Sequence, residues 1–242
     1  ESTRTTDYKP FPPTGQILTS TEWDKSAGYG YGAYHFRRAP GFFDVVAYTG
    51  TGSTRTVSHN LGVAPELMII KGRTPAYNWQ IYAEPLGNTA KLEFTTAAAG
   101  GGLWNSTSPT DSVFTLSGNN NVNQSTAGVN SYIAYLFATV PGISKVGSYS
   151  GTGATQTIDC GFSSGARFVL IKSTTYSGGA WFLFDTERGI TTTAPTSPFI
   201  TLNSNSAESS SSVLEPDSTG FKIIATGNGT NGSGQDYIFL AI

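Results

Sequence analysis

The chain has 242 residues, a formal net charge of −2 and a charged fraction of only 12%, about half the share of an average soluble domain. Because nucleic-acid binding requires clustered Lys and Arg to neutralise phosphates, and only Arg37 and Arg38 are adjacent in this chain, we expect no nucleic-acid partner. No apolar run approaches the roughly 20 residues of a membrane helix, so we expect no membrane insertion.

The first 38 residues are predicted to form a connector that ends in a strand. Pro10, Pro12 and Pro13 lie close together and favour a stiff, extended backbone. Residues 31–36 match residues 132–137 at a constant offset of 101, and the later segment closes a full copy of the pattern described next. We therefore expect residues 31–36 to close a preceding repeat, and the chain to belong to a longer array.

Residues 39–140 are predicted to form an antiparallel β-sandwich. Short apolar segments are separated by Gly- and Asn-rich turns, which is typical of strands, and no longer window shows a capped helical stripe. The expected strands cover residues 45–48, 57–59, 65–71, 79–82, 92–94, 114–116 and 132–138. About seven short strands in about 100 residues is the size of one sandwich domain.

Residues 141–242 are predicted to form a second copy of the same fold. Tyr34 matches Tyr135, residues 48–52 match residues 149–153, and the offset drifts by a few residues farther on, as expected where loops gain or lose residues. The predicted fold class is therefore all-β, with two tandem, jelly-roll-like antiparallel sandwiches of about 100 residues each. The predicted divisions are 1–38, 39–140 and 141–242.

Three segments carry a resemblance to a known family. Residues 38–46, 48–52 and 57–66, with matching phrases at 140–149 and 160–162, resemble a tandem repeat found in tail fibre and other virion structural proteins of tailed bacteriophages. The resemblance covers roughly residues 31–242. It implies a virion location, in a tail fibre or another appendage, and a structural or host-contacting role. It also implies homo-oligomers, most often homotrimers, that contact other virion proteins.

The main functional hypothesis is accordingly a non-enzymatic structural component of a phage fibre or appendage, which contacts the host surface through exposed loops. The alternative is a lectin-like, carbohydrate-binding module. A third hypothesis is a polysaccharide depolymerase, which requires two facing carboxyl groups in a groove, about 5–10 Å apart. No catalytic residue is predicted, because nothing in the sequence requires such a pair.

Three aromatic residues are candidate contacts for a host glycan. Trp104 follows three glycines in a polar segment, where an exposed indole would stack on a sugar ring; the alternative is that it folds back as a lid on its own sandwich. Tyr77 and Tyr176 are weaker candidates in loops that precede Trp79 and Trp181. The two tryptophans occupy matching strand positions and are predicted to be core residues.

Apolar side chains near the domain junctions are candidates for an interface between subunits. Phe42, Phe43 and Ile143 are large apolar residues at these junctions, and a subunit interface is expected to leave such residues exposed on an isolated chain. Replacing both phenylalanines by Ser is expected to loosen assembly.

No metal site and no cofactor are predicted. Cys160 is the single cysteine of the chain, which excludes an internal disulfide and a cysteine metal cluster. His59, its counterpart in the first copy, is predicted to pack near the end of a sheet. The Asn-rich segments 119–123 and 227–233 are interpreted as exposed loops with too few carboxylates for calcium. Asp185 is expected to close a turn with Arg188.

Overall fold

The computed structural model describes residues 34–74, 76–94, 97–125, 130–192 and 196–242. The chain divides into two compact units, Glu1–Phe36 and Arg37–Ile242, and the architecture below is that of the second unit. The predicted connector and most of the predicted strand 31–36 lie outside the described residues. No helix in the described segments is long and apolar enough to cross a membrane.

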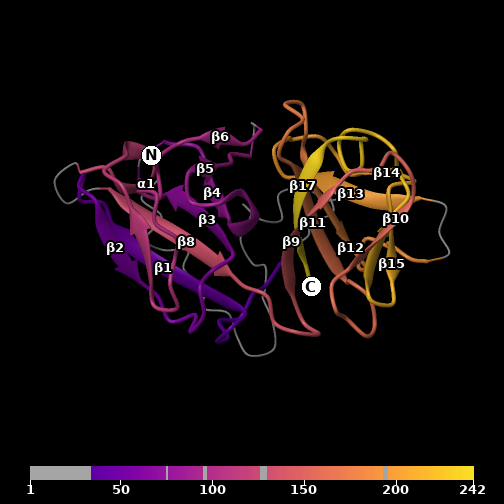
Figure 1. The fold of residues 1–242 in the computed structure, drawn as a ribbon, viewed down its shortest axis with the longest axis horizontal. Helices are drawn as coiled ribbons and strands as arrows, with labels where there is room; N and C mark the ends of the chain where they lie inside the picture. Colours follow the sequence, from indigo (N-terminus) through magenta and orange to yellow (C-terminus); the bar gives the residue numbers. More distant parts are fainter. Residues whose placement is uncertain (1–33, 75, 95–96, 126–129, 193–195) are drawn as a thin grey trace, which may run out of the picture. The chain divides into compact units, whose positions relative to one another are not determined.

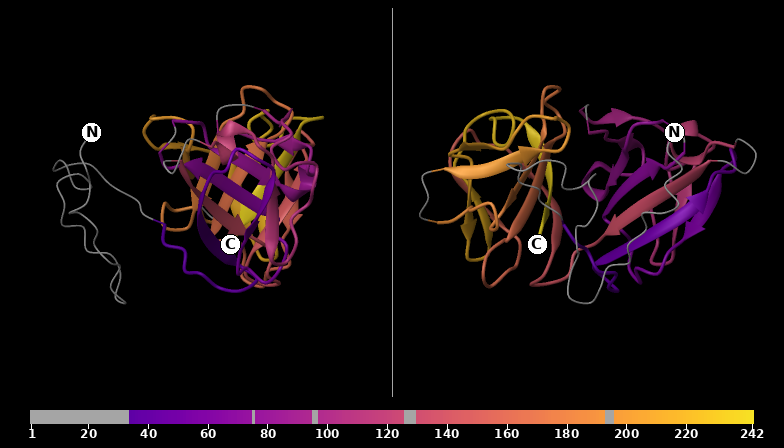
Figure 2. Two further views of the ribbon diagram at one scale, coloured as in Figure 1. Left: turned by 90° about the vertical axis from the view of Figure 1, so that its left-hand side faces the viewer. Right: turned by 180° about the vertical axis from the view of Figure 1, so that it is seen from behind.

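The N-terminal lobe consists of two antiparallel sheets that enclose one core, with a short two-stranded ladder at one side (Figures 1 and 2). The large sheet has the strand order β1-β8-β3-β4, and the opposing sheet pairs β2 with β7. Short helices η1 (Glu84–Leu86) and α1 (Asn120–Asn123) follow β4 and β7. The strands are β1 (Phe43–Thr49), β2 (Arg55–Ser58), β3 (Leu67–Gly72), β4 (Gln80–Ala83), β5 (Ala90–Lys91), β6 (Ala99–Gly100), β7 (Val113–Leu116) and β8 (Ser131–Phe137).

The C-terminal lobe has the same kind of architecture with a larger sheet. Its six strands are ordered β14-β13-β12-β11-β17-β9, and they face a three-stranded sheet of order β10-β16-β15. Every pairing in both lobes is antiparallel among the described residues. The strands are β9 (Lys145–Ser150), β10 (Gln156–Asp159), β11 (Phe168–Ser173), β12 (Trp181–Asp185), β13 (Ser197–Thr201), β14 (Ser209–Ser211), β15 (Leu214–Asp217), β16 (Gly220–Ile223) and β17 (Asp236–Ala241).

The large sheets of the two lobes share one strand order. The order β1-β8-β3-β4 of the N-terminal lobe corresponds to β9-β17-β11-β12 of the C-terminal lobe. A pair of stacked tyrosines lies at the same place in each sheet: Tyr48 on Tyr132 at 5.2 Å between ring centroids, and Tyr149 on Tyr237 at 4.9 Å. Each lobe has its own buried hydrophobic cluster. The predicted all-β class with antiparallel sandwiches is confirmed.

Two strand predictions were wrong: of the strand expected at 92–94 only Leu92 takes part in a ladder, through its bridge to Ile81, and the strand expected at 31–36 is absent in its described part. Residues 34–36 are not in a strand, although residues 31–36 were expected to form one. The matching segment, β8, pairs with β1 on one side and with β3 on the other. The central place in the first sheet is therefore filled by β8, a strand that comes later in the chain.

A buried asparagine closes the same corner of each lobe. The side-chain amide of Asn123 donates to the carbonyls of Ser53 (2.7 Å) and Ser117 (2.9 Å), and its Oδ1 accepts from the Thr51 amide (2.8 Å). Asn231 makes the equivalent bonds to Ala154, Ala225 and Thr152. Both asparagines are fully buried, so residues 119–123 and 227–233 are not wholly exposed loops as predicted.

At each of these corners a backbone carbonyl lies very close to the Cα of a glycine. A Cβ built on Gly50 would lie 2.2 Å from the carbonyl oxygen of Gln124, and one on Gly151 would lie 2.2 Å from that of Gly232. These separations are far below contact distance, so any larger residue would displace the loop. The repeated Tyr-x-Gly segment of the sequence thus has a steric cause, because glycine alone permits this close approach.

The segment that joins the lobes is held by side-chain hydrogen bonds. The buried Ser144 hydroxyl donates to the carbonyl of Ala138 (2.8 Å) and accepts from the amide of Val140 (3.0 Å). Oε2 of Glu66 accepts from the amide of Thr139 (2.9 Å). Since both ends of this turn are bonded to structured elements, the connection has little conformational freedom, in agreement with its shortness in the sequence.

Candidate functional site

The centre of the outer face of the large C-terminal sheet is buried, although this face points away from that lobe's own core. Val169, Ile171, Phe184 and Phe239 belong to the core cluster, and side chains alternate between the two faces of a strand. The centre of the opposite face is nevertheless covered, with relative exposures between 0% and 4% for six of its residues. These residues are Leu170, Lys172, Trp181, Leu183, Ile238 and Leu240.

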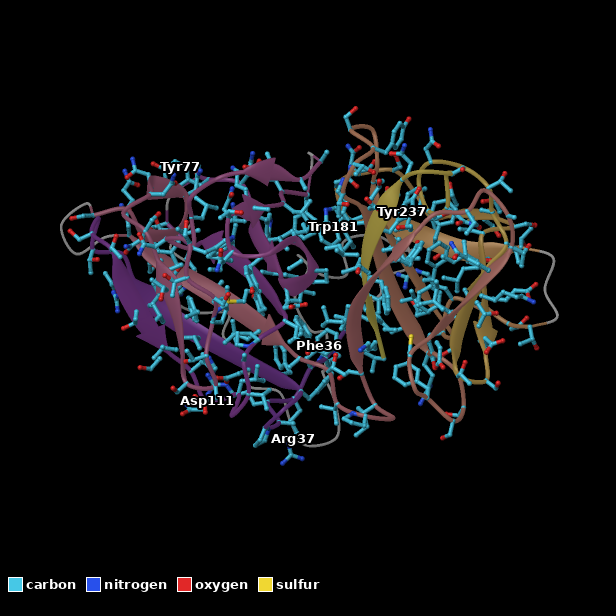
Figure 3. All side chains as sticks on the ribbon, viewed as in Figure 1. Phe36, Arg37, Tyr77, Asp111, Trp181 and Tyr237 are labelled. Carbon is cyan, nitrogen blue, oxygen red and sulfur yellow. The ribbon has the colours of Figure 1, made fainter. Side chains whose placement is uncertain are left out.

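An aromatic seam, defined here as Trp79, Phe94 and Trp181, accounts for part of that burial. Phe94 makes edge contacts with Trp79 at 5.5 Å and with Trp181 at 5.4 Å between ring centroids. The indole Nε1 of Trp181 donates to the carbonyl of Glu93 (3.2 Å). Trp181, labelled in Figure 3, thus contacts a segment of the N-terminal lobe through both its ring and its polar atom.

The carboxylate of Glu93 fixes the segment that carries Phe94. It accepts hydrogen bonds from Lys91 (2.7 Å), Gln80 (3.0 Å) and Asn78 (2.9 Å). Burial by itself would raise the pKa of Glu93, but these three donors together outweigh it and hold the pKa below its ordinary value. The charge therefore persists at neutral pH and keeps Phe94 against Trp181.

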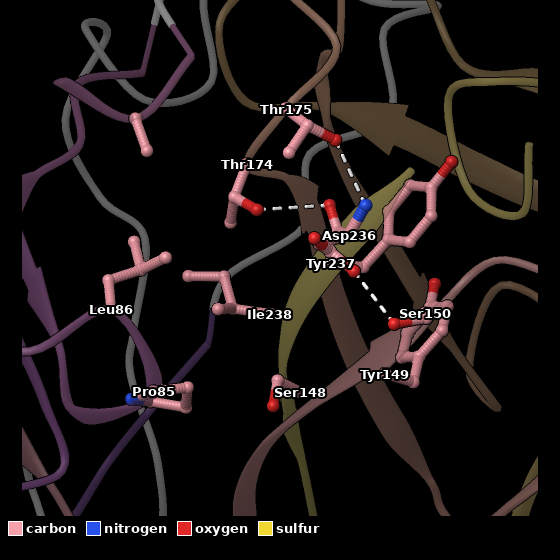
Figure 4. A pocket seen from close by; sticks show the side chains of 11 residues that line it. Pro85, Leu86, Ser148, Tyr149, Ser150, Thr174, Thr175, Asp236, Tyr237 and Ile238 are labelled. Carbon is pink, nitrogen blue, oxygen red and sulfur yellow. Dashed lines mark hydrogen bonds between the residues drawn. The ribbon is translucent and has the colours of Figure 1, made fainter. Parts of the chain in front are cut away.

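A groove of about 520 Å³ is lined by residues of both lobes (Figure 4). One wall comes from the N-terminal lobe and consists of Pro85, Leu86 and Ala98. The floor and the other wall come from β9, β17 and the turn after β11, which contribute mainly hydroxyl-bearing side chains and one carboxylate. These residues are Ser148, Tyr149, Ser150, Thr174, Thr175, Asp236, Tyr237 and Ile238.

Asp236 is the charged group of the groove. The Ser150 hydroxyl donates to its Oδ1 (2.7 Å), and the Thr175 hydroxyl accepts from its backbone amide (2.9 Å). In the described part of the chain Oδ2 of Asp236 accepts no hydrogen bond, and the residue is exposed. A carboxylate oxygen fixed on one side and open on the other is suited to accept from a ligand hydroxyl.

The N-terminal lobe lacks this carboxylate. The amide of Thr174 bonds the carbonyl of Asp236, and the amide of Arg73 bonds that of Ser131 in the same way. Ser131 therefore stands at the position of Asp236. The shared corner is built without a charge in one lobe, so the carboxylate is not needed for the fold.

The groove supports binding chemistry more directly than bond cleavage. Serine and threonine hydroxyls, a carboxylate and apolar side chains together match a ligand that carries both hydroxyls and carbon faces, such as a glycan. Burial raises the pKa of Tyr149 well above its ordinary value, helped by the neighbouring Tyr237, so the phenol remains protonated. Its hydroxyl donates to the carbonyl of Thr230 (2.6 Å) and thus anchors the ring.

Trp104 does not form the predicted sugar-stacking platform. Its side chain is 1% exposed and lies in the core cluster of the N-terminal lobe, against Tyr82 at 5.6 Å. The indole Nε1 donates to the carbonyl of Ala90 (2.8 Å). The alternative, a lid on its own sandwich, is the one that these contacts support. The prediction failed because Trp104 lies in a polar, glycine-rich segment, which is typical of an exposed loop. Its ring is nevertheless buried, and its indole N–H is satisfied by a backbone carbonyl.

The two tyrosine candidates do not line the groove. Tyr77 is half-buried, and its carbonyl accepts a hydrogen bond from Nζ of Lys71. Tyr176 is 37% exposed in the turn between β11 and β12, directly after Thr174 and Thr175, which do line the groove. The prediction that they contact a glycan stays a prediction, and the groove itself was missed because its walls come from distant segments.

The three predicted interface residues have different environments. Phe43 is 5% exposed and packs on Phe137 at 4.9 Å, so it belongs to the interior and cannot serve as an exposed contact. Phe42 is half-buried beside the same ring at 6.4 Å. Ile143 is 56% exposed in the turn between the lobes. Of the three, Ile143 has the exposure that an interface requires.

Other reactive groups have structural partners. Asp185 accepts from the Arg188 amide (2.8 Å) and pairs with its guanidinium, which confirms the predicted turn. His59 is buried and accepts from the Leu61 amide through Nδ1; burial lowers its pKa. Burial raises the pKa of Cys160 to about 12, so its thiol is unreactive at neutral pH. The described residues contain no cluster of His, Cys, Asp or Glu that could hold a metal ion.

Trp79 differs from its predicted role as a core residue. Its ring stacks on Tyr135 at 6.3 Å and remains half-buried, whereas Trp181 is 1% exposed. Both residues point to the outer face of their sheet. Trp181 is buried by the neighbouring lobe and not by its own core, a distinction that strand periodicity does not reveal.

The chain belongs to the family described as "Domain of unknown function (DUF7483)", whose model matches residues 38–242. One family model thus spans both lobes, and its first residue lies next to the start of the compact unit at Arg37. Neither a curated protein nor a solved structure matches the chain.

Proposed function

We propose that this chain is a non-enzymatic structural component of a bacteriophage fibre or another virion appendage. The observation that carries the proposal is the seam, in which Trp181 is buried by the neighbouring lobe. A buried tryptophan and a hydrogen-bonded connection make two sandwiches behave as one stiff body. Stiff, stacked sandwich domains are suited to a fibre or appendage, which must extend away from the particle.

Composition and the resemblance in sequence support the same proposal. Only 12% of residues are charged, so the surface depends on hydroxyl and amide groups for its solubility. The phrases at residues 38–46, 48–52 and 57–66 resemble a repeat of phage virion proteins. In this proposal the chain lies in the extracellular particle, assembles with copies of itself as a homotrimer, and contacts other virion proteins.

Immunolabelling of purified phage particles tests the proposal. Particles of a phage that encodes the chain are purified from a lysate on a density gradient. They are labelled with antibody raised against the whole protein and viewed by electron microscopy. The expected result is label on a fibre or appendage, together with peptides of the chain in the particle band. Peptides confined to the soluble fraction, with unlabelled particles, would refute the proposal.

A second candidate function is favoured by the groove that residues of both lobes line. In this alternative the chain is a lectin-like module that binds host surface glycans with Asp236 and the neighbouring hydroxyl groups. Asp236 stands where the other lobe has Ser131, and that lobe forms the same backbone hydrogen bond without a carboxylate. The carboxylate of Asp236 is therefore not required by the fold, which supports a role in binding.

Glycan binding is measured with the intact protein on a glycan array, followed by titration of any hit. Asp236→Asn keeps the size of the side chain and removes its charge, so we expect about a tenfold or greater loss of affinity for a charge-assisted contact. Glu187→Gln is the matched control, since its side chain is 90% exposed and lies outside the groove. Equal affinity for all three proteins, or no hit at all, argues against this second candidate.

A further inference from the structure

The loop between β16 and β17 contains both Asn-Gly pairs of the chain, Asn228-Gly229 and Asn231-Gly232. In such a pair the backbone nitrogen of the glycine can attack the side-chain carbonyl carbon of the asparagine, because glycine has no Cβ to obstruct the approach. In a folded protein the attack requires that the carboxamide and the following amide are both free. The two pairs differ in both respects.

Asn231-Gly232 is fully engaged in hydrogen bonds. The buried carboxamide of Asn231 donates to the carbonyls of Ala154 (2.7 Å) and Ala225 (2.9 Å). The amide of Gly232 donates to the hydroxyl of Tyr237 (2.8 Å). Because the attack would require these hydrogen bonds to break, the fold protects this pair.

Asn228-Gly229 is free at both reacting groups. Asn228 is exposed, and within the described segments neither its carboxamide nor the amide of Gly229 forms a hydrogen bond. The turn is held instead by the carbonyl of Gly227, which accepts from the amides of Thr230 (3.2 Å) and Asn231 (2.8 Å). The fold therefore orders this turn without engaging either group that would react.

Asn228 has a counterpart in the N-terminal lobe, Asn120. The hydroxyl of Tyr237 donates to the carbonyl of Asn228 (2.8 Å). The hydroxyl of Tyr132 donates to the carbonyl of Asn120 in the same way (2.8 Å). Both asparagines are exposed, so the exposure of the side chain does not distinguish them.

The amide that follows Asn120 is blocked, in contrast to that of Gly229. It belongs to Asn121 and donates to Oδ1 of Asn119 (2.9 Å). The corresponding position in the C-terminal lobe is Gly227, which has no side chain that could accept this hydrogen bond. Of the two counterparts, only Asn228 is thus followed by an uncapped amide.

We propose that Asn228 is a site of spontaneous deamidation in the folded protein. The amide nitrogen of Gly229 forms a bond to Cγ of Asn228, the bond between Cγ and the side-chain nitrogen breaks, and ammonia leaves with the proton of the amide. Water then adds to either carbonyl carbon of the resulting succinimide ring and opens it. The products are aspartate and isoaspartate, and water is the only reactant besides the chain.

Isoaspartate would disturb the anchors of two tyrosines. Its main chain passes through the former side chain, and the α-carbonyl, which in Asn228 accepts from Tyr237, becomes a free carboxylate. The same loop supplies the carbonyl of Thr230 that accepts from Tyr149 (2.6 Å). Both tyrosines line the groove, so we expect the modification to loosen this wall and lower the melting temperature.

Incubation of the full-length, folded protein in mildly alkaline buffer, followed by mass spectrometry of its peptides, measures the reaction at each asparagine. Asn228 should convert about tenfold faster or more than Asn120 and Asn231, because the other two positions must first break hydrogen bonds. In urea this protection disappears, so Asn231 should then react about as fast as Asn228. Asn228→Gln is the control for melting, since its longer side chain closes a ring much less readily.

Two variants at Gly227 test the missing cap. A Cβ built on Gly227 would meet nothing within 4 Å, so Gly227→Asn and Gly227→Ala should both fold, which thermal melting verifies. Gly227→Asn restores the acceptor that Asn119 supplies in the N-terminal lobe. It should slow the conversion of Asn228 several-fold relative to Gly227→Ala.

Three outcomes overturn the assignment of this site. In the first, Asn228 stays intact in the folded protein but converts in urea. In the second, Asn120 or Asn231 converts as fast as Asn228 in the folded protein. In the third, Gly227→Asn and Gly227→Ala convert at equal rates. Isoaspartate that accumulates without lowering the melting temperature would overturn the expected effect on the tyrosines.

Discussion

Lys71 and Lys172 occupy equivalent positions, each near the end of the third strand of its lobe, but their environments differ. Lys172 is fully buried and donates to the carbonyl of Gly179, whereas Lys71 is half-buried and donates to the carbonyl of Tyr77. Trp79 and Trp181 differ in the same sense. The local design is the same, and the difference arises because the neighbouring lobe covers one outer face. Burial in this molecule is thus set partly by neighbours beyond the lobe.

The largest expected effect comes from the tryptophans. Trp181→Ala should lower the free energy of unfolding by about 3–5 kcal/mol, because it removes a fully buried aromatic side chain and leaves a cavity. Trp79→Ala should cost clearly less, about 1–2 kcal/mol, since part of its side chain is already in water in the folded state. Urea denaturation measures both. Equal losses would show that the lobes do not bury Trp181 more deeply than Trp79.

The second prediction concerns the charge of Lys172. Burial lowers the pKa of this lysine to about 8, from 10.5 for the ordinary side chain. Between these two values the unfolded chain binds more protons than the folded one, so stability rises with pH from about 8 towards 10.5. Below pH 8 the folded state bears the full cost of the buried charge, on the order of 3 kcal/mol.

Lys172→Met removes this charge and should therefore remove the rise. The difference in unfolding free energy between the variant and the natural chain, measured at each pH, isolates the lysine. This difference is needed because burial also raises the pKa of Tyr48 and Tyr149, which lowers stability above pH 10. Lys71→Met is the matched control. A slope that survives in Lys172→Met would contradict the assignment.

The third prediction tests what the two lobes share. Asn123→Ala and Asn231→Ala should each cost about 1–3 kcal/mol, because each leaves buried backbone groups without a partner. The two losses in unfolding free energy should be similar, in contrast to those of the tryptophans. The reason is that each asparagine bonds only to residues of its own lobe. Asn120→Ala, at an exposed position in the same short helix, should change stability by less than about 0.5 kcal/mol.

The strands were predictable because their pattern is local. Short apolar, aromatic-rich or alternating segments identified β1, β3, β7 and β8, together with β11 and β17 in the second lobe, and the repeated glycines marked the turns. The strand expected at residues 31–36 failed in its described part because pairing depends on which segment occupies the sheet. That choice involves β1, β3 and β8, which are far apart in the chain.

The candidate site was not predictable in the same way. Trp104 lies in a segment with the composition of an exposed loop, but its indole is inserted into the core and hydrogen-bonded to Ala90. Asp236 carried no signal in the sequence, because its importance comes from Ser150 beside it and from the facing Pro85 and Leu86. These groups are brought together by packing between the lobes, and such packing produces no periodic pattern in the amino-acid sequence.

The amino-acid sequence by itself determined the β class, the approximate positions of the main strands of the first lobe and the repeated glycines, because each follows from the residues within a few positions. Tertiary structure alone decided which tryptophan is buried, which lysine has a lowered pKa and where a groove with a carboxylate lies. The physical reason is that burial is a property of surfaces in contact. Two surfaces with the same local sequence pattern differ as soon as only one of them is covered.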